Sequence, residues 1–136
     1  MRSVNLILSI ALVLGATGAA AQSKPPLNQV REIDDGLLMV GIADEIRKRC
    51  DNIDARMINA WSRIRGLESR AKSLGYTAEE IEDYVTSDEE KARMRRRGEA
   101  LLRQRGFDPA STGDYCTFGR EEIARGSQIG VLLRER

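Results

Sequence analysis

The chain has 136 residues with 22 basic and 21 acidic side chains, and it contains no histidine. A net charge this close to zero argues against a general nucleic-acid-binding protein, whose domain carries an overall basic excess. The lack of histidine excludes Ser-His-Asp and Cys-His catalytic arrangements and removes the commonest zinc ligand.

The first 21 residues are typical of a cleaved signal peptide. Met1-Arg2 is a short positive start, residues 4–14 form an apolar run, and residues 19–21 are Ala-Ala-Ala. Such a run is too short for a bilayer, which needs roughly 20 residues, whereas the small residues suit cleavage before Gln22. An uncleaved anchor or a buried helix is the alternative. We therefore expect a periplasmic protein of about 115 residues, enough for one domain and too few for two.

An extended lead-in is expected over residues 22–33, because its two consecutive prolines cannot be helical. Asp34 or Asp35 is a candidate N-cap of the first helix, since a carboxylate accepts the free amide groups at a helix start. A single helical domain is then predicted over residues 34–136.

The longest apolar stripe in the sequence runs through residues 39–74. Its apolar side chains recur every three or four positions, which places them on one face of a helix. We expect this face to form the spine of the domain, with Trp61 and Ile64 in the core. Asp51-Asn52 interrupts the stripe, and the sequence leaves open whether the segment is one helix or two.

Local signals mark the ends of the later helices. Gly75 and Gly106 suit the left-handed position that commonly ends a helix. Thr77 and Ser87 each precede a glutamate by three residues, as in a capping box. These signals and the loop that follows them predict three helices. The helices are expected over about residues 78–86, 88–105 and 114–126. The apolar segment over residues 127–133 is not assigned between helix and extended chain, and the sequence predicts no strand pair.

Cys50 and Cys116 are the two cysteines of the chain. Two cysteines in an exported protein usually pair, so we expect a disulfide that fixes the last helix to the spine. A redox role is the alternative, but the chain lacks a Cys-x-x-Cys motif. Together these patterns predict an all-α fold, a compact bundle of four to five helices with one disulfide.

A basic run after Ser87 is the candidate partner surface. It comprises Arg93, Arg95, Arg96 and Arg97, whose guanidinium groups suit phosphate or carboxylate. A solvated helix face is the simpler interpretation. The partner expected from this run is an anionic envelope component or an envelope protein, with no nucleic acid, cofactor or metal predicted.

Four segments are similar to a family of small exported bacterial proteins that is known only as a domain of unknown function. These segments are residues 32–38, 41–47, 84–88 and 127–133. Together with the cysteines, these segments are spread along the chain so that the resemblance spans nearly all the mature protein. The resemblance implies an all-helical exported protein with one cysteine pair, and it brings no activity, ligand or catalytic residue with it.

The sequence therefore favours a non-enzymatic binding or structural role in the cell envelope, for example that of an inhibitor or an immunity-type protein. One alternative is a periplasmic chaperone that responds to acid or stress. Another is a carboxylate-dependent hydrolase of cell-wall material, for which residues 79–83 hold the nearest acidic cluster. Acidic residues are also favoured at a helix start by the helix dipole, and that explanation is the simpler one.

Overall fold

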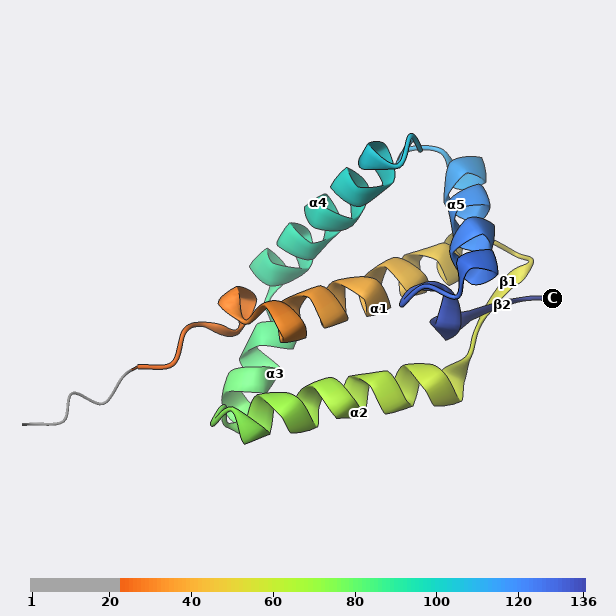
Figure 1. Cartoon of the computed structure of the whole chain (residues 1–136). Coiled ribbons are helices and arrows are strands. Elements are labelled where there is room, and N and C mark those ends of the chain that lie inside the picture. Colours follow the sequence, from red (N-terminus) through yellow and green to blue (C-terminus); the bar gives the residue numbers. More distant parts are fainter. Residues whose placement is uncertain (1–22) are drawn as a thin grey trace, which may run out of the picture.

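The computed structural model describes residues 23–136 (Figure 1), so the signal peptide expected over residues 1–21 lies outside the described part. Within residues 23–136 there are five α-helices, two short 3-10 helices and one two-stranded antiparallel ribbon. The elements in chain order are η1 (Leu27–Gln29), α1 (Arg31–Arg49), β1 (Ile53–Ala55), α2 (Met57–Ser73), α3 (Ala78–Thr86), α4 (Asp88–Gln104), α5 (Thr112–Arg125), η2 (Gly130–Leu132) and β2 (Leu133–Glu135). The predicted all-α bundle is confirmed.

Helix α1 is the centre of the fold (Figure 1). Helices α2 and α4 lie along opposite sides of it, α3 joins them at one end, and α5 crosses the other end. Leu38, Ile42 and Ile46 recur four residues apart on α1, so they share one face. They form the main core cluster together with Leu102 of α4 and Phe118 of α5.

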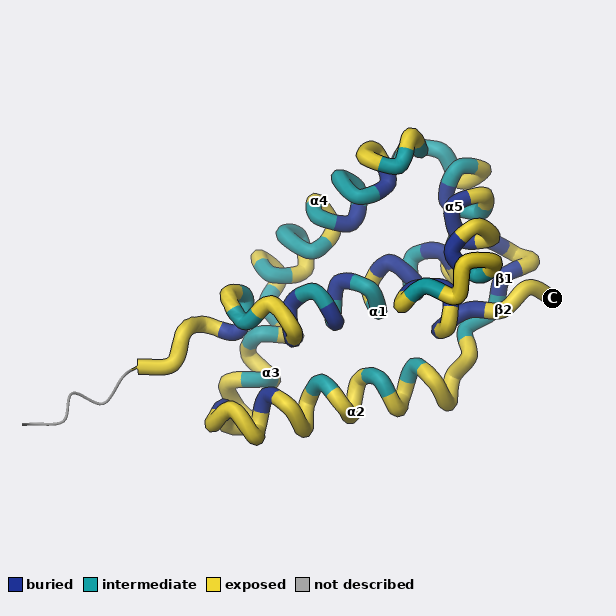
Figure 2. The backbone as a smooth tube through the Cα atoms, in the orientation of Figure 1, coloured by how far each residue is buried: buried dark blue, intermediate teal, exposed yellow. Residues whose placement is uncertain are grey.

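The expectation of one apolar spine over residues 39–74 is wrong in its second half. Strand β1 separates α1 from α2, and the chain reverses there so that α2 runs back beside α1. Ile58, Trp61 and Ile64 consequently face solvent, with Trp61 57% exposed, and Figure 2 shows α2 exposed along most of its length. The extended residues of β1 interrupt the helix. Apolar residues of α2 that follow those of α1 at helical spacing in the sequence therefore do not lie on the same face in the structure.

The predicted start of the first helix is also wrong. Helix α1 begins at Arg31, which places Asp34 inside the helix instead of at its N-cap. Leu27 and Ile33 are buried in a second, smaller cluster against the end of α2. Burial of these two side chains favours the early turn, so the lead-in expected over residues 22–33 is interrupted by η1 at Leu27 and ends where α1 begins at Arg31.

The later helix boundaries agree with the predicted signals. Gly75 and Gly106 have positive φ angles of 95° and 84°, as expected for residues that end a helix. Thr77 forms a complete capping box at the start of α3. The capping box predicted at Ser87 is only half formed. Ser87 accepts a hydrogen bond from the backbone N–H of Glu90 at the start of α4, but the Glu90 side chain accepts from Arg93 and Asn28 instead of from the backbone of Ser87.

A short β-ribbon, which the sequence analysis does not predict, closes the fold. Strand β2 pairs antiparallel with β1, with Leu133 opposite Ala55. Leu133 is almost fully buried, and Ile129 and Leu132 before it also belong to the main core. Strands of three residues carry too few alternating positions to be read from sequence, which explains why residues 127–133 could not be assigned.

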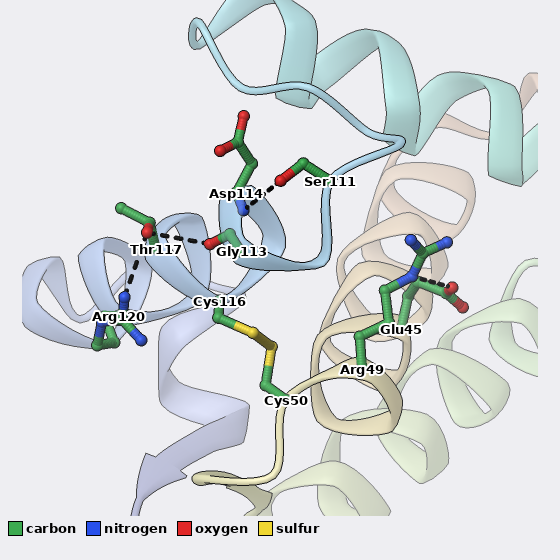
Figure 3. The surroundings of a disulfide bond; sticks show 9 residues. All are labelled: Glu45, Arg49, Cys50, Ser111, Gly113, Asp114, Cys116, Thr117 and Arg120. Carbon is green, nitrogen blue, oxygen red and sulfur yellow. Dashed lines mark hydrogen bonds and ion pairs between the residues drawn. A yellow bond between two sulfur atoms is a disulfide. The ribbon is translucent and has the colours of Figure 1, made fainter.

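The predicted disulfide between Cys50 and Cys116 is present. It joins the end of α1 to α5, with the two Cα atoms 5.6 Å apart (Figure 3). One turn later in α5, a Cβ atom on Gly119 would lie 2.7 Å from Cγ2 of Ile46. The glycine therefore allows α5 to approach α1 closely beside the disulfide.

Candidate functional site

A groove of about 470 Å³ runs along α1 between α2 and α4. Its floor includes Leu37, Val40 and Gly41, which lie three and four residues apart and so share one face of α1. Leu38 and Ile42 of the main core also line the groove, so its base continues into the core. The groove volume lies within the range of about 300–1,000 Å³ that is usual for small-molecule sites.

The walls of the groove are apolar and open to solvent. Met57, Ala60 and Ile64 contribute from α2, where Met57 is 57% and Ile64 is 43% exposed. Val85 at the end of α3 and Met94 on α4 contribute from the other side. Clustered exposed apolar side chains on a small protein are typical of an interaction surface.

Gly41 on α1, like Gly66 on α2, has no packing contact that explains the glycine in the described structure. A Cβ atom on Gly36, Gly98 or Gly119 would press against a side chain of another helix, which explains the glycine in each case. At Gly41 a Cβ atom would meet no heavy atom within 4 Å in the described part of the chain. Glycine costs a helix interior about 1 kcal/mol relative to alanine, and no internal contact accounts for that cost here. The lack of a side chain at position 41 leaves the floor of the groove open.

The charged side chains along the groove leave a local positive excess. Asp44, Glu45 and Glu90 each form an ion pair with a basic residue of their own helix. Lys91 and Arg95 also line the groove, one turn apart on α4, and neither forms an ion pair with any residue in 23–136. This wall of the groove is therefore suited to an anionic group.

The four arginines of the predicted partner surface do not lie together. Arg93 and Arg97 turn inward, and both bind the carboxylate of Asp34. Arg95 and Arg96 are exposed, and Arg95 lines the groove. Binding of an anionic partner by this run stays a prediction, and the structure leaves Arg95 and Arg96 as the residues available for it.

Asp34 is a buried carboxylate that the sequence analysis misses. Its side chain accepts hydrogen bonds from Tyr84, Arg93 and Arg97, and the residue is only 4% exposed. Burial raises the pKa of Asp34, but the hydrogen bonds from Arg93 and Tyr84 and the charge of Arg97 outweigh it and hold the pKa below its usual value. The residue is thus a charged link between α1, α3 and α4 at neutral pH. The four-residue spacing of Arg93 and Arg97 shows that they share a face of α4, but not which carboxylate they bind.

The same contact affects Tyr84. Burial and the hydrogen bond to the Asp34 carboxylate raise the pKa of the Tyr84 hydroxyl well above its usual value. The phenol therefore stays protonated and donates to Asp34 throughout the physiological pH range. The hydrogen bond from Tyr84 to Asp34 thus links α3 to α1.

The acidic cluster over residues 79–83 has a local structural role. Glu80 completes the capping box of α3 and also pairs with Lys24 at 2.9 Å. Among residues 23–136 there is no group of three or more side chains that could hold a metal ion. None of the helices in this part of the chain combines the length and apolar character needed to cross a membrane.

Comparison with known families finds a match over residues 25–134, which include every helix described above, both cysteines and the groove. The matching family is described as a family of unknown function, DUF5333. The chain belongs to this family. No curated protein matches the chain, and no solved structure matches it. The resemblance to a domain of unknown function is confirmed, while the small size and export of its members stay predictions.

Proposed function

We propose that this DUF5333 protein is a non-enzymatic binding protein of the bacterial cell envelope, which acts in the periplasm after its signal peptide is removed. The observation that carries the proposal is the open apolar groove on α1. A ligand in the groove would cover Met57 and Ile64, and each Å² of apolar surface removed from water contributes roughly 25 cal/mol. Glycine at position 41 also keeps the floor of the groove free, because it places no side chain there.

A pair of glycine variants tests binding in the groove. Gly41→Leu is expected to weaken binding of an uncharged apolar dye, N-phenyl-1-naphthylamine, by at least about tenfold, because the leucine side chain fills the floor. The wild-type protein is expected to bind one dye molecule, as measured by fluorescence titration at neutral pH. Leucine at position 41 should also raise the free energy of unfolding by roughly 0.7 kcal/mol through its helix propensity, so lost binding would not reflect unfolding.

Gly66→Leu is the matched control. Gly66 also lies in a helix interior and faces open space in the described structure, but it is outside the groove. This variant should gain the same stability and bind the dye like the wild type. Equal binding by both variants, or no saturable binding by the wild type, would contradict a binding role for the groove.

The proposed location is tested by export in a bacterial host with two membranes. The periplasmic fraction is expected to contain a form that begins at Gln22, as measured by intact mass, because the residues before it suit signal peptidase. A variant that lacks residues 2–21 is the control and should stay in the cytoplasm. Recovery of the uncleaved chain from the membrane fraction would show that the segment is an anchor and not a cleaved signal.

A further inference from the structure

We infer that the groove binds a single-chain anionic amphiphile, meaning an alkyl or acyl chain that ends in a carboxylate or a phosphate. The inference rests on the proposed function, because it names the class of ligand that the groove takes. Three observations carry it: the shape of the groove, its two unpaired cations and its glycine floor.

The length and lining of the groove suit an extended chain. The α1 residues that line it extend from Leu37 to Arg49, a length of about 18 Å at 1.5 Å per residue. Apolar side chains of α1 and α2 line the groove, among them Val40 and Ile64. An extended hydrocarbon chain can therefore lie along the groove in contact with apolar groups.

The two cations give the ligand its charge. Lys91 and Arg95 lie four residues apart on α4, and like charges at this spacing disfavour a helix. Within residues 23–136 no carboxylate forms an ion pair with either of them, while every acidic side chain of the groove lining has a partner. An anionic head group beside α4 would neutralise both charges while the chain lies over the apolar floor. A neutral or cationic amphiphile would lack this interaction.

Gly41 lets the chain lie against the backbone of α1. Leu37 and Val40 line the floor beside it, and Met57 and Ile64 form the facing wall. A chain in this position would contact apolar side chains on both sides and the helix backbone below. We therefore expect affinity to rise by up to about fourfold for each methylene group until the chain fills the groove.

Displacement of N-phenyl-1-naphthylamine from the wild-type protein tests the ligand class. Dodecyl phosphate and dodecanoate distinguish the two head groups, and dodecyl maltoside and dodecyltrimethylammonium are the neutral and cationic comparisons, all below their micelle concentrations. One or both anions should displace the dye at concentrations at least about tenfold lower than the other two compounds. Native mass spectrometry should show one bound anion per chain.

A charge-neutralising pair of variants tests the two cations. Lys91→Gln combined with Arg95→Gln should weaken the affinity for the anions by about tenfold relative to the affinity of the same variant for the uncharged dye. Arg31→Gln combined with Arg120→Gln removes the same charge from exposed positions outside the groove and should behave like the wild type.

The inference is overturned if the neutral amphiphile displaces the dye as well as the anions do, or if the Lys91 and Arg95 variant keeps the wild-type response. It is also overturned if the dye binds saturably and no single-chain amphiphile displaces it, a result that would favour a protein partner. In each of these cases dye binding itself persists, so the proposed function survives. Failure of the wild-type protein to bind the dye saturably would instead contradict the proposed function.

Discussion

Replacement of Asp34 by asparagine is expected to lower the free energy of unfolding by about 3 kcal/mol. The carboxylate is almost fully buried and is the common acceptor for Tyr84, Arg93 and Arg97. An amide keeps the shape of the side chain but removes the buried charge between the two guanidinium groups, so that Arg93 keeps only Glu90 and Arg97 keeps only Asp35 as a charged partner among the described residues. Because these arginines are still partly exposed, water compensates for some of the loss, and we expect a value at the lower end of the range for broken buried pairs. Urea denaturation at pH 7 measures it.

Asp35→Asn is the matched control for this experiment. Its carboxylate is adjacent in sequence but 45% exposed, and it pairs with Arg97 alone. An exposed ion pair contributes about 0–1 kcal/mol, so this variant should be close to the wild type. Similar losses for the two variants would show that the Asp34 contacts are no more than a surface network.

The pH dependence of the stability lost in Asp34→Asn follows from the direction in which the pKa of Asp34 is shifted. The pKa of Asp34 is lower in the folded protein than the usual value near 3.9 in an unfolded chain. Its stabilisation is therefore fully present above about pH 5 and is lost as the pH falls through the folded-state pKa, below about 4. The difference in unfolding free energy between wild type and Asp34→Asn should be constant from pH 7 to about 5 and should shrink below pH 4. A difference that grows on acidification would contradict the assigned direction.

Removal of the disulfide is expected to have the second large effect. Replacing Cys50 and Cys116 together by serine should lower the free energy of unfolding by about 4 kcal/mol, because the link closes a long loop in the unfolded chain. The two residues are 66 positions apart. Domains of this size are typically stable by only about 5–15 kcal/mol, so much of the margin would be lost. Thermal and urea denaturation measure the change.

Reduction of the wild-type protein provides the control for this prediction. The chain has two cysteines, so a reductant should bring the wild type to the stability of the serine variant and leave that variant unchanged. A loss below about 1 kcal/mol in the variant would show that packing of Phe118 and Gly119 against α1 holds α5 without the link.

Features that depend on a few neighbouring residues were predictable from the sequence. The helix ends at Gly75 and Gly106 and the capping box at Thr77 are examples, since backbone conformation and side-chain caps act within one turn. The pairing of Cys50 with Cys116 was predictable for a different reason, because two cysteines allow a single intramolecular pair.

Features that depend on distant parts of the chain were not predictable. The partners of Asp34 lie on α3 and α4, and no local pattern shows that Arg93 will reach it. The exposure of Trp61 depends on the reversal at β1, which in turn depends on pairing with β2. The groove was missed for the same reason, because its walls come from helices that are separate in sequence.

The position of β2 and the segment before it has a consequence for how the protein is made. Ile129, Leu132 and Leu133 complete the core around α1, yet they are synthesised long after that helix. A growing chain that has reached only α4 therefore lacks part of its core and its disulfide partner, and stable folding has to wait for these non-local contacts. For a protein proposed to cross a membrane before folding, such delayed completion would keep the nascent chain open to the export machinery.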